Sequence, residues 1–166
     1  MTTNPVNIYE YEAIAKERLA QGEYDFIAGA ATDEITLRRT RAVFDSIMMK
    51  PRMMVDVSQR DLSTTVLGNK IDFPVMLDPA GNHGAAHPDG ELATAKAAGA
   101  MNTIMALSSH ASRTLEDVAE VATGPLWFQY YFFKDRELTL DMAKRAEDAG
   151  YSALCVTLDA KIKPKR

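Results

Sequence analysis

Apolar residues recur at helical spacing in the first third of the chain. Their pattern predicts a first helix from Asn7 to Ala20, with Asn7 as its cap, and a second short helix from Tyr24 to Ala31. A third helix is predicted from Asp33 to Met48 and is brought to an end by Pro51. The apolar stripe of this third helix consists of Ile35, Leu37, Val43, Phe44 and Ile47. We therefore expect the chain to begin with a helical cap.

The pattern then changes to short strands. Residues 64–67 are strand formers, Gly68 and Asn69 form a typical tight-turn pair, and residues 70–73 can return as a second strand. This stretch predicts a β-hairpin. We place the helical cap and the hairpin together in an N-terminal part, residues 1–73.

From residue 74 onward, short apolar strands alternate with helices. The predicted strands are 74–77, 103–107, 126–131 and 153–157, and the predicted helices are 90–100, 114–121 and 136–149. Thr114 and Asp117 have the spacing of a capping box at the start of the second of these helices. Continuous apolar strands that alternate with helices indicate a parallel sheet covered by helices, the α/β class.

Two architectures fit this alternation: an open doubly wound sheet and a (β/α)₈ TIM barrel. Four βα units in about 90 residues are half of what the barrel requires. On the barrel interpretation, residues 74–166 form the first half of a barrel. A second chain or segment must then supply the other half, because half a barrel exposes two strand edges.

Composition narrows the class of protein further. With 46% hydrophobic and 25% charged residues, the chain has the balance of a globular protein, and its net charge of −4 argues against nucleic-acid binding. The chain has no apolar run near the ~18 residues of a membrane span and no signal-peptide pattern. Its single cysteine, Cys155, fits a reducing compartment, so we expect a cytoplasmic protein.

Polar and small residues follow each predicted strand, where parallel α/β folds bind ligands. These candidates are Asp78, Pro79, Ala80, Gly81, Asn82, Ser108, Ser109, His110, Gln129, Tyr131, Thr157 and Asp159. The plain alternative is that strand ends are polar because they meet water. No P-loop or G-x-G-x-x-G motif is present, and the three histidines lack the spacing of a zinc site, so we expect no metal.

At this point the chain shows a resemblance that covers nearly its whole length in order. It resembles the N-terminal half of the FMN-dependent 2-hydroxy acid oxidase/dehydrogenase family, which includes glycolate oxidase, lactate oxidase and mandelate dehydrogenase. The matching stretches are 11–16, 24–31, 44–52, 55–57, 87–91, 107–109, 127–131, 134–136, 145–150 and 156–159. Any one stretch is weak, but the ordered set is specific.

The resemblance implies a TIM barrel with FMN at the carboxyl ends of its strands. It places Pro79, Ala80 and Gly81 beside the flavin, with the backbone N–H of Gly81 facing N5. It also implies that the isoalloxazine edge is hydrogen-bonded by Ser108, Gln129 and Thr157. An amide and two hydroxyls suit this edge because the ring presents both donors and acceptors.

Three further residues take catalytic roles by the same resemblance. Tyr131 donates its phenol to the substrate, and Asp159 orients a catalytic histidine and stabilises its charged form. Arg166 helps to hold the substrate carboxylate and the developing charge. The plain alternatives are a core aromatic for Tyr131, a turn cap for Asp159 and for Ser108, and a solvated charge for Arg166.

The chain departs from the family pattern at two substrate-binding positions. Phe26 stands where many members carry a tyrosine that binds the substrate carboxylate. His110 stands where glycolate-type enzymes have a tryptophan that lines the pocket. Together with Gly81, these residues predict a pocket shaped differently from one for glycolate.

The expected function is therefore FMN-dependent oxidation of a small L-2-hydroxy acid to a 2-oxo acid. The chain supplies the flavin edge and part of the substrate site. The histidine base, a second arginine, a lysine near the flavin and the phosphate site belong to a complementary C-terminal half, and the assembled enzyme is expected to be a homotetramer. Two alternatives stay open: a non-redox enzyme that binds FMN or a phosphate ligand, and an inactive half-barrel assembly fragment.

Overall fold

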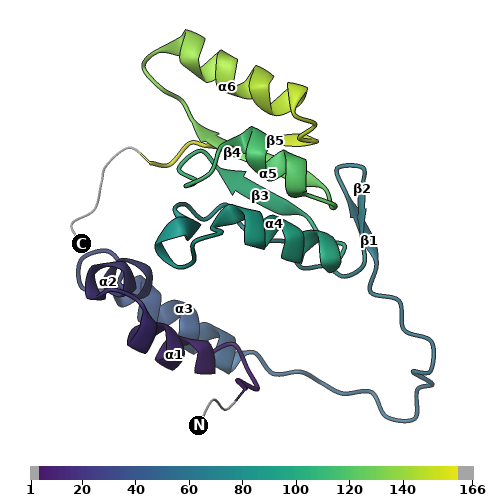
Figure 1. Cartoon of the computed structure of the whole chain (residues 1–166). Helices are drawn as coiled ribbons and strands as arrows, with labels where there is room; N and C mark the ends of the chain where they lie inside the picture. The colour runs from purple at the N-terminus through teal and green to yellow at the C-terminus, as the bar shows by residue number, and fades with distance from the viewer. Residues whose placement is uncertain (1–3, 161–166) are drawn as a thin grey trace. The chain divides into compact units, whose positions relative to one another are not determined.

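The structure, a computed structural model, describes residues 4–160 and divides into two compact units (Figure 1). The first comprises residues 4–58 and the second residues 59–160. The hairpin thus groups with the parallel sheet in the second unit. The division at residue 73 into two domains stays a prediction.

The first unit consists of three short helices, as predicted; the first and the third have narrower bounds, and the second lies three residues earlier than predicted. They are α1 (Glu10–Arg18), α2 (Gln21–Ala28) and α3 (Ile35–Ser46). The side-chain oxygen of Asn7 accepts hydrogen bonds from the N–H groups of Tyr9 and Glu10, at 3.0 and 3.3 Å, so Asn7 caps the turn that leads into α1. None of the three helices contains a buried residue, and the apolar stripe of α3 is exposed.

The predicted hairpin is present, but its turn lies one residue earlier. Strands β1 (Thr64–Val66) and β2 (Asn69–Ile71) pair antiparallel, with Val66 opposite Asn69. The two turn residues are Leu67 and Gly68, whose φ angles are 46° and 82°. A two-residue hairpin loop of type I′ requires positive φ at both positions, and glycine adopts it without strain. Asn69 is therefore the first residue of β2.

The second unit is built on a parallel sheet in the order β3–β4–β5. Its strands are β3 (Met105–Ser108), β4 (Leu126–Tyr131) and β5 (Ala153–Thr157). The bounds of β4 and β5 agree with the sequence prediction, and β3 is shifted toward its carboxyl end. The parallel α/β class is confirmed, and the described residues form an open sheet.

The strand predicted at 74–77 is wrong in its extent. Only Leu77 joins the sheet, through a parallel bridge in which its N–H donates to the Ile104 carbonyl and its carbonyl accepts from the Ala106 N–H, both at 2.9 Å. Pro74 and Pro79 flank this short segment and have no N–H to donate to a ladder. The backbone is thus held at one point, next to the loop that follows.

Three helices cover one face of the sheet, side by side in chain order (Figure 1). They are α4 (Glu91–Ala100), α5 (Leu115–Val121) and α6 (Arg136–Asp148), and a 3₁₀ turn, η1 (His83–Ala85), precedes them. As predicted, α5 is capped by Thr114, whose hydroxyl accepts the Asp117 N–H at 3.1 Å. The Asp135 carboxylate caps α6 in the same way.

The sheet is apolar on both faces. Toward the helices, Phe128 and Tyr130 of β4 pack with Val118 and Ala146 in the larger core. On the opposite face, Trp127 packs in a second cluster with Ile71 of the hairpin and with Ile104 and Ala106. Two apolar faces are typical of a parallel sheet that is covered on both sides. Among residues 4–160, no helix is long and apolar enough to cross a membrane.

The larger core gives a stability prediction. Phe128 is fully buried, so Phe128→Ala is expected to lower the free energy of unfolding by about 3–5 kcal/mol through lost contacts and a cavity. The neighbouring Phe132 is exposed, and Phe132→Ala is expected to cost about 1 kcal/mol or less. Denaturant titration followed by circular dichroism measures both. Equal losses in the two variants would contradict this assignment of the core.

Candidate functional site

A chain of side-chain hydrogen bonds crosses the carboxyl ends of β3, β4 and β5. The Ser108 hydroxyl donates to the side-chain oxygen of Gln129 at 3.1 Å, and the Gln129 amide nitrogen donates to the Thr157 hydroxyl at 2.7 Å. Gln129 is only 4% exposed. Three of the predicted site residues are thus in direct contact.

The strand register explains this arrangement. Ser108 lies directly opposite Gln129, and Thr157 lies opposite Tyr131, two residues farther along β4. Side chains two residues apart point to the same face of a strand, so Gln129 reaches one neighbour directly and the other diagonally. The face is that of Trp127, opposite to the helices.

Ser108 also organises the loop that follows β3. Its hydroxyl oxygen accepts the His110 N–H at 3.1 Å while it donates to Gln129. The hydroxyl therefore both caps a turn and takes part in the chain of polar side chains. The turn-cap interpretation of Ser108 is confirmed, and its contact with a flavin stays a prediction.

The loop after Leu77 approaches the loop after β3 closely at Gly81. The Asn82 N–H donates to the His110 carbonyl at 3.0 Å. A Cβ atom on Gly81 would lie 3.0 Å from the Cβ of His110, so a larger residue would push the loops apart. Of its two predicted neighbours at the flavin, Pro79 is half-buried and Ala80 is exposed.

His110 and Tyr131 form an aromatic pair at this edge of the sheet. Their ring centroids are 5.0 Å apart and their planes meet at 74°, an edge-to-face contact. Tyr131 is half-buried at the last position of β4. His110 therefore contacts the loop after Leu77, Ser108 of β3 and Tyr131 of β4.

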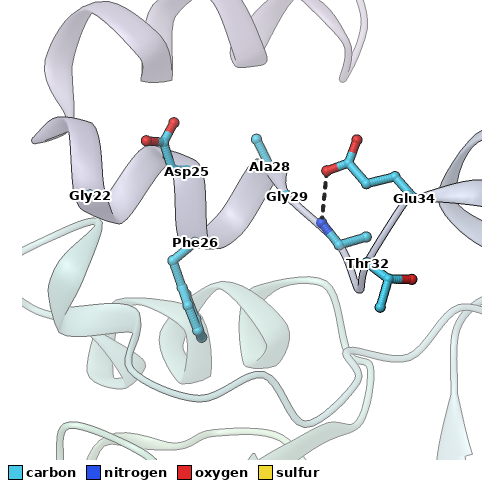
Figure 2. A pocket seen from close by; sticks show the side chains of 8 residues that line it. Gly22, Asp25, Phe26, Ala28, Gly29, Thr32 and Glu34 are labelled. Atoms are coloured by element: carbon cyan, nitrogen blue, oxygen red, sulfur yellow. Dashed lines mark hydrogen bonds between the residues drawn. The ribbon is translucent and has the colours of Figure 1, made fainter. Parts of the chain in front are cut away.

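Three further predicted residues remain to be located. Phe26 belongs to the first unit, Asp159 is exposed two residues after the end of β5, and Arg166 lies outside the described residues. Phe26 lines a pocket of about 580 Å³ within the helical cap (Figure 2). There Asp25 and Phe26 project from opposite sides of α2, and Glu34 accepts the Ala30 N–H at 3.1 Å.

The sequence analysis missed a buried carboxylate behind the loops. Glu91, at the start of α4, has no exposed surface. Burial raises the pKa of its carboxyl, but hydrogen bonds from Ser112 and His83 outweigh burial and hold the pKa below its ordinary value. Glu91 belongs to the stretch 87–91 that resembles the family. The sequence signal that could have indicated it is an acidic residue directly after a glycine.

The strand-end residues fit an isoalloxazine edge. A flavin ring presents carbonyl oxygens, a ring nitrogen and an N–H, and thus needs donors and acceptors in one row. Ser108, Gln129 and Thr157 provide two hydroxyls and an amide, already aligned by their own hydrogen bonds. Within residues 4–160, no group of three His, Cys, Asp or Glu side chains is placed to hold a metal ion.

Comparison with known proteins identifies the family. The profile of the FMN-dependent dehydrogenase family matches residues 15–166. The chain belongs to this family, whose cofactor is FMN, as the resemblance implied.

Two curated relatives show how much of such an enzyme the chain covers. It is 48% identical to glycolate oxidase 3 of Arabidopsis thaliana over 92% of its own length and 42% of the relative. It is 46% identical to the L-lactate oxidase of Nostoc sp. over 99% of its length and 46% of the relative. The chain thus spans less than half the length of these relatives.

Solved structures give the same coverage. An active mutant of (S)-mandelate dehydrogenase matches with a TM-score of 0.93 at 36% identity, over 98% of this chain and 46% of the other. The lactate oxidase of Pediococcus acidilactici matches with a TM-score of 0.94 at 29% identity, over all of this chain and 46% of the other. The arrangement of elements is therefore shared with oxidoreductases of known structure.

The pKa of the Cys155 thiol, on β5, gives a prediction that can be tested by varying the pH. Burial raises the pKa of its thiol, and the Asp78 carboxylate raises it further. Because the thiolate is the reactive form, the rate of alkylation is expected to rise at higher pH than for a small free thiol. Mass spectrometry of the peptide that contains Cys155, after iodoacetamide treatment from pH 7 to 10.5, measures the midpoint.

Asp78→Asn serves as the comparison variant. It removes the second cause of the shift, so its midpoint is expected between that of the unchanged protein and that of the free thiol. A wild-type midpoint equal to that of the free thiol contradicts the assignment.

Proposed function

We propose that this chain supplies the flavin edge and part of the substrate site of an enzyme that oxidises an L-2-hydroxy acid to a 2-oxo acid with FMN. The observation that carries the proposal is the chain of hydrogen bonds from Ser108 through Gln129 to Thr157. It lies where parallel α/β proteins bind their ligands, in a chain of an FMN-dependent family.

In this proposal, the row Ser108, Gln129 and Thr157 binds the pyrimidine edge of the flavin. Gln129 matters most, because a buried amide must keep hydrogen-bond partners and so holds a fixed orientation. The backbone of Pro79, Ala80 and Gly81 lies against the ring, and the Gly81 N–H faces N5. The absence of a side chain at Gly81 supports this role, since the loop backbone must approach closely.

The substrate side of the site is proposed to consist of Tyr131, His110, Phe26 and Arg166. Tyr131 donates its phenol to the substrate, and the imidazole of His110, packed against the Tyr131 ring, lines the pocket for the substrate side chain. Phe26 provides an apolar surface without a hydroxyl, so the substrate carboxylate depends on Arg166 and on groups from the complementary half. A larger, less polar 2-hydroxy acid than glycolate fits this set.

The chain's own contribution to the reaction is binding and orientation. When bound, FMN would supply the two-electron oxidant for conversion of the carbon–oxygen single bond to a carbonyl, the hydroxyl proton passing to the histidine base of the complementary half and the hydrogen on carbon to the flavin. Asp159 holds the catalytic histidine of the complementary half and stabilises its protonated form. Arg166 balances the charge of the substrate carboxylate.

The architecture we propose is a (β/α)₈ barrel completed by a C-terminal half. Two observations support it: the sheet face around Trp127 is apolar, and among the described residues β5 pairs only with β4. Leu154 and Val156 of β5 are also exposed apolar residues. A homotetramer of the complete enzyme and a cytoplasmic location stay predictions. One relative, from Arabidopsis thaliana, is named a peroxisomal oxidase.

The dependence of FMN binding on the complementary half tests the proposal. Titration of FMN into residues 1–166 alone is expected to leave its fluorescence almost unquenched. Addition of the complementary half is expected to give tight binding, and anaerobic 2-hydroxy acids then bleach the flavin absorbance. Tight binding without bleaching by any 2-hydroxy acid would support the non-redox alternative, and no binding to the assembled protein would overturn the flavin site.

The central amide gives a residue-level prediction. Gln129→Leu leaves the hydroxyls of Ser108 and Thr157 without their partner, and FMN binding in the assembled enzyme is expected to weaken about 10- to 100-fold. Gln59→Leu makes the same chemical change at an exposed loop position and serves as the control. Unchanged flavin affinity in Gln129→Leu would show that the amide does not contact the ring.

A further inference from the structure

The buried carboxylate of Glu91 accepts three hydrogen bonds from two loops. One of its oxygens accepts the N–H groups of His83 at 2.9 Å and of Ser112 at 3.0 Å. The other accepts the Ser112 hydroxyl at 2.5 Å. We define the Glu91 clamp as Glu91, Ser112 and the N–H groups of His83 and Gly84.

The clamp connects two loops that are far apart in sequence. His83 and Gly84 follow the Leu77 bridge, and Ser112 follows β3. The Gly84 N–H donates to the Ser112 hydroxyl oxygen at 3.0 Å, so the serine bonds both the carboxylate and the first loop. Each group of the clamp is thus held by at least one partner on another segment.

The two loops carry the groups of the proposed flavin and substrate sites. Gly81 lies two residues before His83, and His110 two residues before Ser112. The Asn82 N–H binds the His110 carbonyl, and the His110 N–H binds the Ser108 hydroxyl. The clamp is therefore connected to Ser108, Gln129 and Thr157 through one covalent step, from His83 to Asn82, followed by hydrogen bonds.

The carboxylate is held by N–H and O–H donors. Among the ion pairs of residues 4–160, none involves Glu91. A buried carboxylate without a cation is costly unless several donors satisfy it, and the removal of the carboxylate leaves those donors unpaired. Its position in the first turn of α4, next to the positive end of the helix dipole, adds to its stabilisation.

We propose that Glu91 is a positioning residue that fixes the loop of Gly81 against the loop of His110, and thereby the distance between the flavin edge and the substrate pocket. This inference rests on the proposed function for its catalytic consequence. Glu91 acts through the two loops and contacts neither cofactor nor substrate. If Glu91 contributed only to packing, its replacement would lower the stability of the protein without a specific local effect on these two loops.

Hydrogen exchange tests the clamp without cofactor or substrate. In the full polypeptide, Glu91→Ala is expected to lower the protection of the His83 and Ser112 amides by about tenfold or more. Glu91→Gln keeps the shape and one acceptor oxygen, so its loss is expected to be smaller. Ser112→Ala is expected to expose chiefly the Gly84 amide, which loses its acceptor.

Glu116→Gln is the matched control. Glu116 is exposed and pairs with Arg145 at 2.9 Å, so this variant removes the same charge away from the two loops and should leave their exchange unchanged. If Glu91→Ala does not fold, Glu91→Gln and Ser112→Ala decide the question. Unchanged protection at residues 83, 84 and 112, or a uniform loss across the sheet, overturns the proposal.

Flavin binding provides the second measurement. In the assembled enzyme, Glu91→Gln is expected to weaken FMN binding about tenfold and lower kcat more than it raises KM, since the loops that orient the reactants loosen. A local exchange effect with unchanged FMN affinity and kcat overturns the link to the site. Failure of the wild-type protein to bind FMN overturns the proposed function, while the exchange result for the clamp stands by itself.

Discussion

The parallel register of β3, β4 and β5 is the constraint on which the site depends. A strand presents alternate side chains to each face, so a slip of one residue in β4 would turn Gln129 toward the helices and Phe128 away from them. The apolar residues on both faces resist such a slip, because Phe128 and Trp127 each fill a separate core. Hydrophobic packing thereby fixes the position of a polar amide.

Two buried polar groups then connect neighbouring strands and the loops that follow them. Gln129 is satisfied by hydroxyls on both neighbouring strands, and Glu91 by donors from two loops. Inside a protein such groups are strongly stabilising when paired and costly when unpaired, so each enforces one geometry. The sheet defines the row of donors and acceptors, and the carboxylate defines the loops above it.

Strong local patterns made part of this structure predictable. β4 and β5 are continuous apolar runs between turn residues, and Thr114 begins α5 as its capping pattern indicates. The segment 74–77 had a similar apolar pattern but lies between prolines, and only its bridge to Met105 forms. The stripe of α3 predicted a helix correctly, but periodicity does not determine what covers it. Ser108, Gln129 and Thr157 were expected at one site because parallel strands end at one edge, whereas the burial of Glu91 depends on loop contacts that no local pattern encodes.

The same contrast separates two kinds of site residue, those on strands and those on loops. Residues on strands, such as Gln129 and Tyr131, are positioned by a ladder that tolerates little variation. Residues on loops, such as Gly81 and His110, depend on a few hydrogen bonds and can change with the substrate while the sheet stays the same. Of the two differences from the family pattern, His110 lies in such a loop, whereas Phe26 lies in α2. The apolar face around Trp127 follows the same rule for parallel sheets, which are stable when both faces are covered: Ile71 of the hairpin packs with Trp127 on the face opposite to the helices.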